Sequence, residues 1–322
     1  MTAPPLPARQ LGSSPVRVTE LAFGGAVLGN LYTAISEEQA AATVTAAWDG
    51  GIRAFDTAPH YGLGLSERRL GAALAQYPRD EYVISTKVGR LLEPAREPHR
   101  TDPEGFAVPA RLRRVRDYSA DGVRRSIEAS LTRLGLDRID IVLIHDPDDY
   151  GEQAFRAAYP ALEGLRAQGC IGAIGAGMNQ TAMLTRFVTD TDVDVVLVAG
   201  RYTLLDRSAG QDLLPAARRQ GVSVLAGGVF NSGLLAAPDR AGTYDYQPAP
   251  AALIARAREL QAACERFGVP LRAAAARFPA RHPAVAGVLI GARSPAEITD
   301  AIAWWAAEIP AGLWNALDAE QP

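Results

Sequence analysis

Eight strand-like runs alternate with helical patterns along this chain, and this alternation constrains the fold more than any other feature. The runs begin near residues 21, 52, 82, 139, 171, 194, 222 and 285. The clearest intervening helix follows Ser119, repeats apolar residues on one face and stops at Gly135. Another begins at Ser294, where a capping serine precedes a proline and a glutamate. Strands that alternate with helices predict a parallel sheet, and eight is the number that closes a (β/α)8 barrel.

A doubly wound open sheet is the alternative to the barrel. Such a sheet normally carries a G-x-G-x-x-G turn after its first strand when it binds a dinucleotide. Here the first strand ends in residues 23–29 (FGGAVLG), and residues 172–177 (GAIGAG) have the wrong spacing. We therefore predict a single (β/α)8 barrel domain over residues 1–322, with a flexible segment at 1–9 and a small β-hairpin at 11–18.

Two connections in the predicted barrel are too long to be simple loops. Residues 88–118 follow the third strand, and residues 228–250 follow the seventh. Both begin at the carboxyl ends of strands, where barrel enzymes place their active sites. We expect these two segments to shape the substrate pocket and to hold the cofactor.

The composition is that of a globular protein and gives no sign of a charged macromolecular partner. Hydrophobic residues make up 48% of the chain and charged residues 21%, and the formal net charge is −3. This balance gives no reason to expect nucleic acid or a membrane as a partner, and without an apolar leader the expected location is cytoplasmic. We expect Cys170 and Cys264 to be buried, reduced thiols, and no Cys or His spacing predicts a metal site.

Polar side chains follow three consecutive strands of the predicted barrel. Asp56 and Tyr61 follow the second strand, Lys87 ends the third and His145 ends the fourth. Since the carboxyl ends of parallel strands meet at one rim, these side chains should lie together. Each of them alone has a structural explanation, such as a turn cap for Asp56 or a solvated edge charge for Lys87. Four unlike polar groups at consecutive strand ends favour a shared site.

Together these groups could move a proton at a carbonyl or an alcohol. A free phenol has a pKa of about 10, and an ammonium beside it lowers that pKa because it stabilises the phenolate. Lys87 could supply the ammonium for Tyr61, and Asp56 could supply the anion that a buried lysine needs. His145 could donate a hydrogen bond that orients a carbonyl oxygen. Such a relay suits hydride transfer, with His60 as a wall of the pocket rather than a base.

The chain resembles the aldo-keto reductases from Leu11 to about Ile309. The resemblance rests on residues 55–62 (FDTAPHYG), 66–67 (SE), 85–87 (STK), 141–145 (IVLIH), 174–179 (IGAGMN) and 291–295 (GARSP). It implies the barrel fold and an NAD(P)-dependent oxidoreductase. It also implies the catalytic roles: Tyr61 as acid/base, Lys87 as modulator of its pKa, Asp56 as the partner of Lys87, and His145 as the substrate orienter.

The resemblance further implies which residues bind the cofactor. The family holds NAD(P) extended across the barrel rim without a glycine-rich fingerprint, and Asn179 matches the position expected to hold the nicotinamide carboxamide. The predicted cofactor-binding residues are Gly25, Asp56, Asn179, Gly228, Phe230, Asn231, Gly233, Gly291, Arg293 and Glu297. The predicted substrate-binding residues are His60, Tyr61, His145 and Arg201.

Departures from the common family pattern bear on the cofactor. Where many members have Tyr-Ser after the seventh strand, with the tyrosine stacked on nicotinamide, this chain has Gly227 and Gly228. Glu297 stands where an arginine is common, and a carboxylate there would repel a 2′-phosphate and could accept a ribose hydroxyl. Glu297 could also simply complete the cap at Ser294, and Arg293 could serve a phosphate. NAD is therefore the preferred expectation and NADP the alternative.

Residues 198–206 and 228–235 resemble the branch of the family that contains the D-threo-aldose (L-fucose) 1-dehydrogenases and the pyridoxal 4-dehydrogenases. The leading hypothesis is an NAD-dependent dehydrogenase that oxidises an aldose lactol, a small-molecule substrate, to a lactone. One alternative is an NADPH-dependent general aldehyde or ketone reductase. Another is a cofactor-binding sensor or assembly subunit with little turnover.

Overall fold

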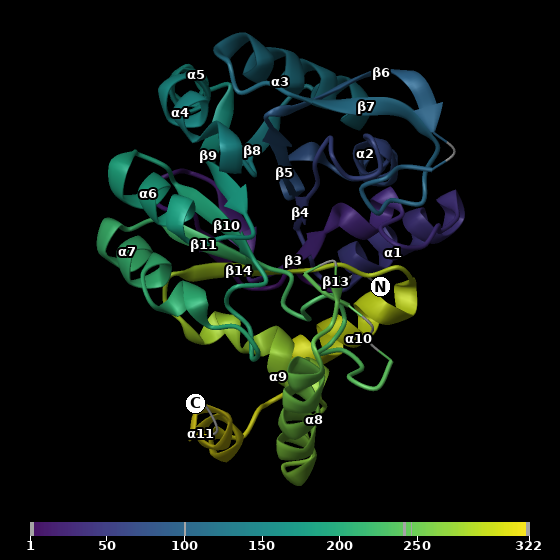
Figure 1. Cartoon of the computed structure of the whole chain (residues 1–322), viewed down its shortest axis with the longest axis vertical. Coiled ribbons are helices and arrows are strands. Elements are labelled where there is room, and N and C mark those ends of the chain that lie inside the picture. The colour runs from purple at the N-terminus through teal and green to yellow at the C-terminus, as the bar shows by residue number, and fades with distance from the viewer. Residues whose placement is uncertain (1–2, 100, 241–242, 246, 320–322) are drawn as a thin grey trace.

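Eight parallel strands close into a barrel in the computed structural model, which describes residues 3–99, 101–240, 243–245 and 247–319. Helices surround the ring of strands (Figure 1). In ring order the strands are β3 (Leu21–Gly24), β4 (Ala54–Asp56), β5 (Val83–Val88), β8 (Ile139–His145), β9 (Ile171–Met178), β10 (Val195–Ala199), β11 (Ser223–Gly227) and β14 (Val285–Ile290). These are the eight predicted strands in sequence order, so the prediction of a (β/α)8 barrel is confirmed.

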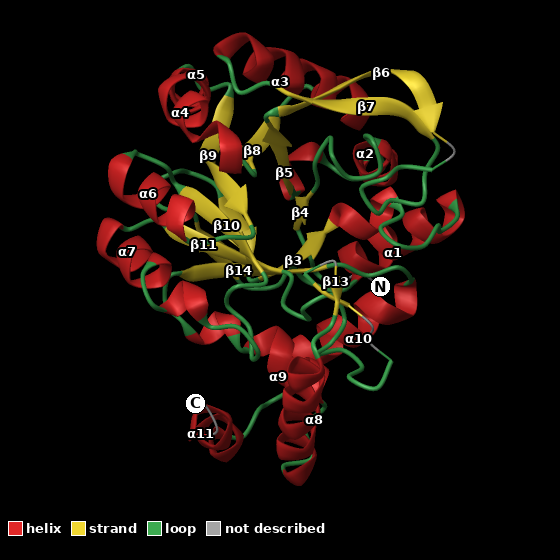
Figure 2. Cartoon of the chain, viewed as in Figure 1, coloured by secondary structure: helices red, strands yellow, loops and turns green. Residues whose placement is uncertain are grey.

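One helix or helical pair follows each barrel strand, and two further helices lie outside this repeat. The helices that cover the barrel are α1 (Glu37–Asp49), α2 (Leu65–Leu74), α3 (Ala120–Leu134), α4 (Gly151–Gln153) with α5 (Tyr159–Ala167), α6 (Ala182–Asp190), α7 (Leu213–Gln220), α9 (Leu271–Arg277) and α10 (Pro295–Ala306). The additional helices α8 (Ala251–Arg266) and α11 (Ala311–Ala319) pack together at one side of the molecule (Figure 2).

The helix boundaries follow the capping signals of the sequence. The Ser119 side chain accepts a hydrogen bond from Gly122 N at the start of α3, and Gly135 ends that helix with a φ of 66°. Ser294 likewise accepts from Glu297 N at the start of α10. Ser66 lies inside α2, where its hydroxyl donates to Gly25 O instead of capping the helix.

A hairpin closes the amino-terminal end of the barrel. Strands β1 (Ala8–Gln10) and β2 (Arg17–Thr19) pair antiparallel, so the hairpin extends beyond the predicted residues 11–18 at both ends. Leu11, Val16 and Val18 pack with the inward-facing residues of the barrel strands. The chain before the hairpin is also tied down: Ala3 and Leu6 donate backbone hydrogen bonds to the turn after α1. Residues 3–9 therefore differ from the expected flexible segment, and residues 1–2 lie outside the described part of the chain.

Both long connections contain two-stranded ribbons rather than plain loops. In the first, β6 (Arg90–His99) pairs antiparallel with β7 (Ala110–Arg116). In the second, β12 (Thr243–Tyr244) pairs with β13 (Gln247–Pro248). Both ribbons leave the carboxyl ends of barrel strands, so they stand over the rim where the predicted site residues lie.

Two further expectations concern the surface. Cys264 is buried as expected, but Cys170 is exposed because it lies in the turn before β9 rather than inside the strand. None of the described helices is long and apolar enough to cross a membrane. The cytoplasmic location stays a prediction.

Candidate active site

The strand register brings the predicted acid and ammonium together at the rim. Asp56, the last residue of β4, pairs with Ser85 of β5, two residues before Lys87. Side chains two positions apart on a strand face the same side, so Ser85 and Lys87 both point inward. Lys87 Nζ lies 2.6 Å from Asp56 Oδ2, and Ser85 Oγ donates to Asp56 Oδ1 at 2.9 Å. The carboxylate is therefore held by two donors from the neighbouring strand.

Tyr61 completes this cluster from the loop between β4 and α2. Lys87 Nζ lies 3.1 Å from the Tyr61 hydroxyl oxygen and 3.0 Å from Thr57 O. Gly62 allows the loop to turn tightly: it has a φ of 60°, and a Cβ there would lie 2.2 Å from Gly29 O. The loop is thus packed tightly against the 3-10 helix that follows β3 (Gly25–Gly29), which fixes the phenol beside the ammonium.

His145 brings a neutral imidazole to the same place. It ends β8, and its ring centroid lies 5.9 Å from that of Tyr61 and 5.6 Å from that of His60. Burial, reinforced by the positive charge of Arg90, holds the pKa of His145 well below its usual value. The same causes lower the pKa of His60 to about 2. Both rings are neutral near pH 7 and offer hydrogen bonds rather than charge.

The protonation of the phenol, the ammonium and the carboxylate follows from burial and contacts. Burial alone would lower the pKa of Lys87, but Asp56 and Tyr61 outweigh burial and raise it above its usual value. Burial raises the pKa of Asp56, and Lys87 opposes this effect. The 2.6 Å distance between Lys87 Nζ and Asp56 Oδ2 is that of a charge-assisted hydrogen bond, so we assign the two groups as an ion pair. Burial also raises the pKa of Tyr61, and Lys87 offsets this effect only in part. From the sequence we expected a lowered pKa for Tyr61. That expectation is wrong, because the burial of the phenol, which raises its pKa, cannot be seen in the sequence.

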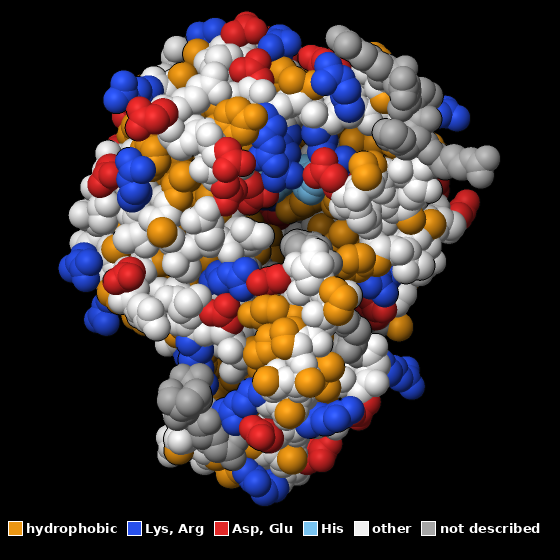
Figure 3. Space-filling model, viewed as in Figure 1, with side chains coloured by type: hydrophobic (Ala, Val, Ile, Leu, Met, Phe, Trp, Pro, Cys, Tyr) orange, Lys and Arg blue, Asp and Glu red, His pale blue; other side chains and the backbone are white. Residues whose placement is uncertain are grey.

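Two adjoining cavities open at this cluster. Figure 3 shows the hollow on the face of the molecule, with basic, acidic and histidine side chains at its edge. One cavity, of about 280 Å³, lies on the His145 side and contains Tyr61, Lys87 and His60 in its wall. The other, also of about 280 Å³, extends across the rim towards β11 and β14. Tyr61 and Asn179 belong to both walls, so they stand where the two cavities meet.

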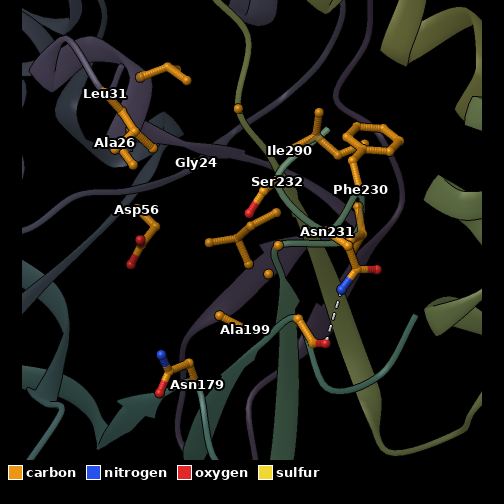
Figure 4. Close-up of a pocket in the computed structure, with 18 of the residues that line it drawn as sticks. Gly24, Ala26, Leu31, Asp56, Asn179, Ala199, Phe230, Asn231, Ser232 and Ile290 are labelled. Atoms are coloured by element: carbon orange, nitrogen blue, oxygen red, sulfur yellow. Dashed lines mark hydrogen bonds between the residues drawn. The ribbon is translucent and has the colours of Figure 1, made fainter. Parts of the chain in front are cut away.

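The second cavity is lined largely by backbone, as an extended flat ligand requires. Glycines that line it are Gly24, Gly25, Gly200, Gly227, Gly228, Gly233 and Gly291. Asn231 also lines it, and Figure 4 shows its amide bonded to the chain at Gly200, with Nδ2 lying 3.2 Å from Gly200 O. The other amide atom, Oδ1, is buried and has no hydrogen-bond partner among the described residues. A bound ligand could supply the missing donor.

Most of the predicted site residues line one of the two cavities, and three of them line neither. Gly25, Asp56, Asn179, Gly228, Phe230, Asn231, Gly233 and Gly291 line the second cavity, and His60, Tyr61 and His145 line the first. Arg201, Arg293 and Glu297 line neither cavity. The Arg201 guanidinium donates to Asn179 O at 2.8 Å and pairs with Asp206 and Asp245. This geometry does not support the predicted contact of Arg201 with substrate and gives it a bracing position behind Asn179.

Several lining residues had not been predicted. Arg90, Glu104, Phe106 and Asp146 line the first cavity. Two of them could have been found in the sequence. Asp146 directly follows His145, and Arg90 lies just after the predicted third strand of the barrel, β5. Glu104 and Phe106 lie in a connection without periodicity, so their position depends on the ribbon that only the structure shows.

Comparisons with known proteins identify the family of this chain. The sequence model of the aldo/keto reductase family matches residues 20–320. The chain belongs to the aldo/keto reductase family. A D-threo-aldose 1-dehydrogenase from a Pseudomonas species is 48% identical over 93% of each chain, and a pyridoxal 4-dehydrogenase from Microbacterium luteolum is 41% identical over 97% of this chain and 96% of that protein. The structure of a glycerol dehydrogenase from Gluconobacter oxydans superposes with a TM-score of 0.76 over 97% of this chain and 94% of that chain, at 24% identity, which supports the fold.

Membership in this family makes the chain an oxidoreductase that acts on alcohol or carbonyl groups with a nicotinamide cofactor. The second cavity fits such a cofactor, because its glycine-rich wall admits an extended molecule and Asn231 presents an unpartnered buried acceptor. Asn179, Asn231 and the backbone around Gly228 and Gly291 are placed to hold it. When bound, the nicotinamide would supply the hydride donor or acceptor. The catalytic and binding roles of the individual residues stay predictions.

Proposed function

We propose that this chain is an NAD-dependent dehydrogenase that oxidises the anomeric alcohol of an aldose lactol to a lactone. The hydrogen bond between Lys87 and Tyr61, at the point where the two cavities meet, is the observation that carries the proposal. Similarity to an aldose dehydrogenase at 48% identity supports the choice of substrate class.

The chain's own residues would handle the proton. Tyr61, as phenolate, would take the proton of the anomeric hydroxyl while the C–H hydrogen leaves as hydride, so that a C=O bond forms. Lys87 stabilises the phenolate by its charge and is itself fixed by Asp56 and Thr57 O. His145, kept neutral by burial, would orient the reacting oxygen through a hydrogen bond.

The charges around the second cavity support NAD over NADP. The charged residues that line it, Asp56 and Asp245, are paired with Lys87 and Arg201 and so add little net charge. Glu297, near the rim, keeps its negative charge while its Oε2 accepts from Arg293 N at 2.7 Å. A 2′-phosphate carries negative charge and would be repelled by the Glu297 carboxylate. Arg293 remains the group that could favour NADP.

A reductase is the second candidate, and one observation favours it. Burial raises the pKa of Tyr61, which keeps the proton on the phenol near neutral pH. That state suits proton donation to a carbonyl, the step that completes reduction.

An absorbance assay tests these functions directly. The purified chain is supplied with NAD or NADP and with L-fucose, D-arabinose or pyridoxal, and with NADH or NADPH and simple aldehydes. We expect oxidation of an aldose with NAD to give the highest kcat/KM. Preference for NADPH and aldehydes would replace the dehydrogenase by the reductase, and no turnover with any substrate would favour a binding module.

A further inference from the structure

The first cavity is lined by both apolar and charged side chains. The apolar residues of its wall are Ala26, Leu31, Phe106, Met178, Leu197 and Ala199. Besides the catalytic Lys87, three charged residues contribute to the same wall: Arg90, Glu104 and Asp146. The proton relay described above uses none of these three. A cavity with this mixed lining suits a molecule that combines apolar C–H groups with hydrogen-bonding groups, as a sugar ring does.

Arg90 and Asp146 form a fixed ion pair at the edge of His145. Arg90 Nη2 bonds Asp146 Oδ2, and the Arg90 side chain is only 7% exposed. Asp146 has a φ of 41°, a left-handed conformation that is uncommon outside glycine. Its carbonyl accepts from the Tyr118 hydroxyl at 2.9 Å and from Arg116 Nη1 at 3.0 Å, which holds this turn. The turn directs the carboxylate back over the cavity instead of along the chain.

Glu104 is different, because its carboxylate is close to several donors without being saturated by them. Oε1 lies 3.4 Å from Arg114 Nη1, and Oε2 lies 3.7 Å from His60 Nδ1 and 4.0 Å from Arg90 Nη1. These separations exceed the roughly 2.7–2.9 Å of a charge-assisted hydrogen bond. His60 Nδ1 is buried and has no hydrogen-bond partner in the described part of the chain. A ligand hydroxyl in the cavity could donate to the Glu104 carboxylate.

The segment that carries Glu104 is anchored to the catalytic loop. Arg114 bonds both carboxylate oxygens of the fully buried Asp102 at 2.7 Å and donates to His60 O at 2.8 Å. The position of Glu104, two residues after Asp102, is therefore coupled to the loop that bears Tyr61. The backbone at Glu104 is thus held beside the cavity, while its half-exposed side chain is open to a ligand.

The charges of this wall favour a neutral ligand. Lys87 is neutralised by Asp56, and Arg90 is neutralised by Asp146. An anionic substrate would meet Glu104 without an unpaired cation to attract it. Hydroxyl groups, in contrast, can donate to the carboxylates and accept from His60.

We propose that Glu104, supported by Arg90 and Asp146, recognises the ring hydroxyls of a neutral polyhydroxylated substrate. The inference rests on the proposed oxidation of lactols and names the residues that select the sugar among them. Glu104 accepts a hydroxyl hydrogen bond directly, whereas Arg90 acts mainly by positioning Asp146. The contact contributes to ground-state and transition-state binding alike, so its loss should raise KM more than it lowers kcat.

The test compares two lactols with the same six-membered ring: L-fucose, which carries further ring hydroxyls and a methyl group, and 2-hydroxytetrahydropyran, which carries neither. Glu104→Ala should lower kcat/KM for L-fucose by about tenfold more than for 2-hydroxytetrahydropyran, mainly through KM. Glu93→Ala is the matched control. Glu93 lies on the same ribbon and pairs with Arg113, but it lines neither cavity, so the ratio should stay that of the wild type.

The outcomes separate this inference from the proposed function. Equal losses on both lactols, or no loss on either, would overturn the role of Glu104 even if the wild type oxidises sugars well. If the wild type oxidises neither lactol but reduces aldehydes, the dehydrogenase proposal fails. The role of Glu104 is then decided by the ratio of kcat/KM for D-erythrose to that for butanal, compared between the wild type and Glu104→Ala. A wild type that shows no preference for the hydroxylated member of either pair overturns the inference as well.

Discussion

The Nζ atom of Lys87 lies 3.1 Å from the hydroxyl oxygen of Tyr61. Two other acceptors, Asp56 Oδ2 and Thr57 O, occupy the remaining hydrogen atoms of the ammonium. The phenol oxygen therefore accepts from Lys87, and its own O–H bond is left to point elsewhere. Since Tyr61 lines both cavities, that proton is available to a ligand.

Tyr61→Phe should abolish most of the turnover while leaving the cofactor cavity intact. The substitution removes only the hydroxyl, so kcat should fall by about 10²- to 10⁴-fold, the usual contribution of a general acid or base. Steady-state rates measure the loss, and titration with NADH followed by protein fluorescence should show little change in Kd. If the variant keeps its activity, another group carries the proton.

Asp56→Asn should destabilise the fold as well as the site. The substitution leaves the buried Lys87 ammonium without its counterion, which costs about 3–5 kcal/mol in comparable buried pairs. Urea unfolding at pH 7 measures the change in the free energy of unfolding. Glu152→Gln is the control, since the Glu152–Arg156 pair is 81% exposed on both sides and should matter little. Equal effects of the two substitutions would mean that Lys87 does not depend on Asp56.

The pH profile should differ between the two directions of the reaction. Burial raises the pKa of Tyr61 above its usual value near 10, so phenolate is scarce at pH 7 and grows with pH. In the direction of oxidation, kcat/KM should rise about tenfold per pH unit between pH 7 and pH 9, because phenolate is the base. In the direction of reduction it should stay nearly flat over the same range. A plateau of the oxidation rate below pH 8 would contradict a raised pKa.

The catalytic cluster could be predicted from sequence because topology alone places it. Residues at the carboxyl ends of consecutive parallel strands share one rim, so Asp56, Lys87 and His145 had to be neighbours once the barrel was recognised. Tyr61 came with the rigid loop that follows Asp56. The barrel itself was readable because each strand and helix carries a strong local signal.

The protonation of Tyr61 and the polar wall could not be predicted in the same way. Desolvation depends on every atom packed around the phenol, and these atoms come from several distant segments. The wall formed by Glu104 depends on the ion pair between Asp102 and Arg114, which only the paired ribbon brings together. The exposure of Cys170 likewise depends on where the strand begins, and strand boundaries are weakly encoded.

Glu297→Gln should reduce the preference for NAD over NADP without loosening α10. The Glu297 carboxylate accepts from Arg293 N, and a glutamine oxygen can accept the same hydrogen bond. The variant thus removes the negative charge and keeps the cap. The ratio of kcat/KM for NAD to that for NADP should fall while the melting temperature changes little. Arg293→Ala should move the ratio in the opposite direction, and an unchanged ratio in both variants would place the selection of cofactor elsewhere.

His60 should make the fold sensitive to acid. Its pKa is about 2 in the folded chain because of burial and the nearby arginines, against about 6.5 when the chain is unfolded. Between these two values the unfolded chain binds the extra proton, so acidification favours unfolding. From pH 7 to pH 5 the contribution of His60 should lower the free energy of unfolding by about 2 kcal/mol.

Replacing this imidazole isolates its contribution from that of the other titrating groups. Urea unfolding of the wild type and of His60→Gln at both pH values gives the difference, in which the effects of Asp56, Asp146 and His145 largely cancel. The variant should lose less stability on acidification than the wild type. His282→Gln is the control, because the His282 ring is more exposed, so its lowered pKa should contribute less. If both variants respond to acid as the wild type does, the His60 imidazole is not held neutral by the fold.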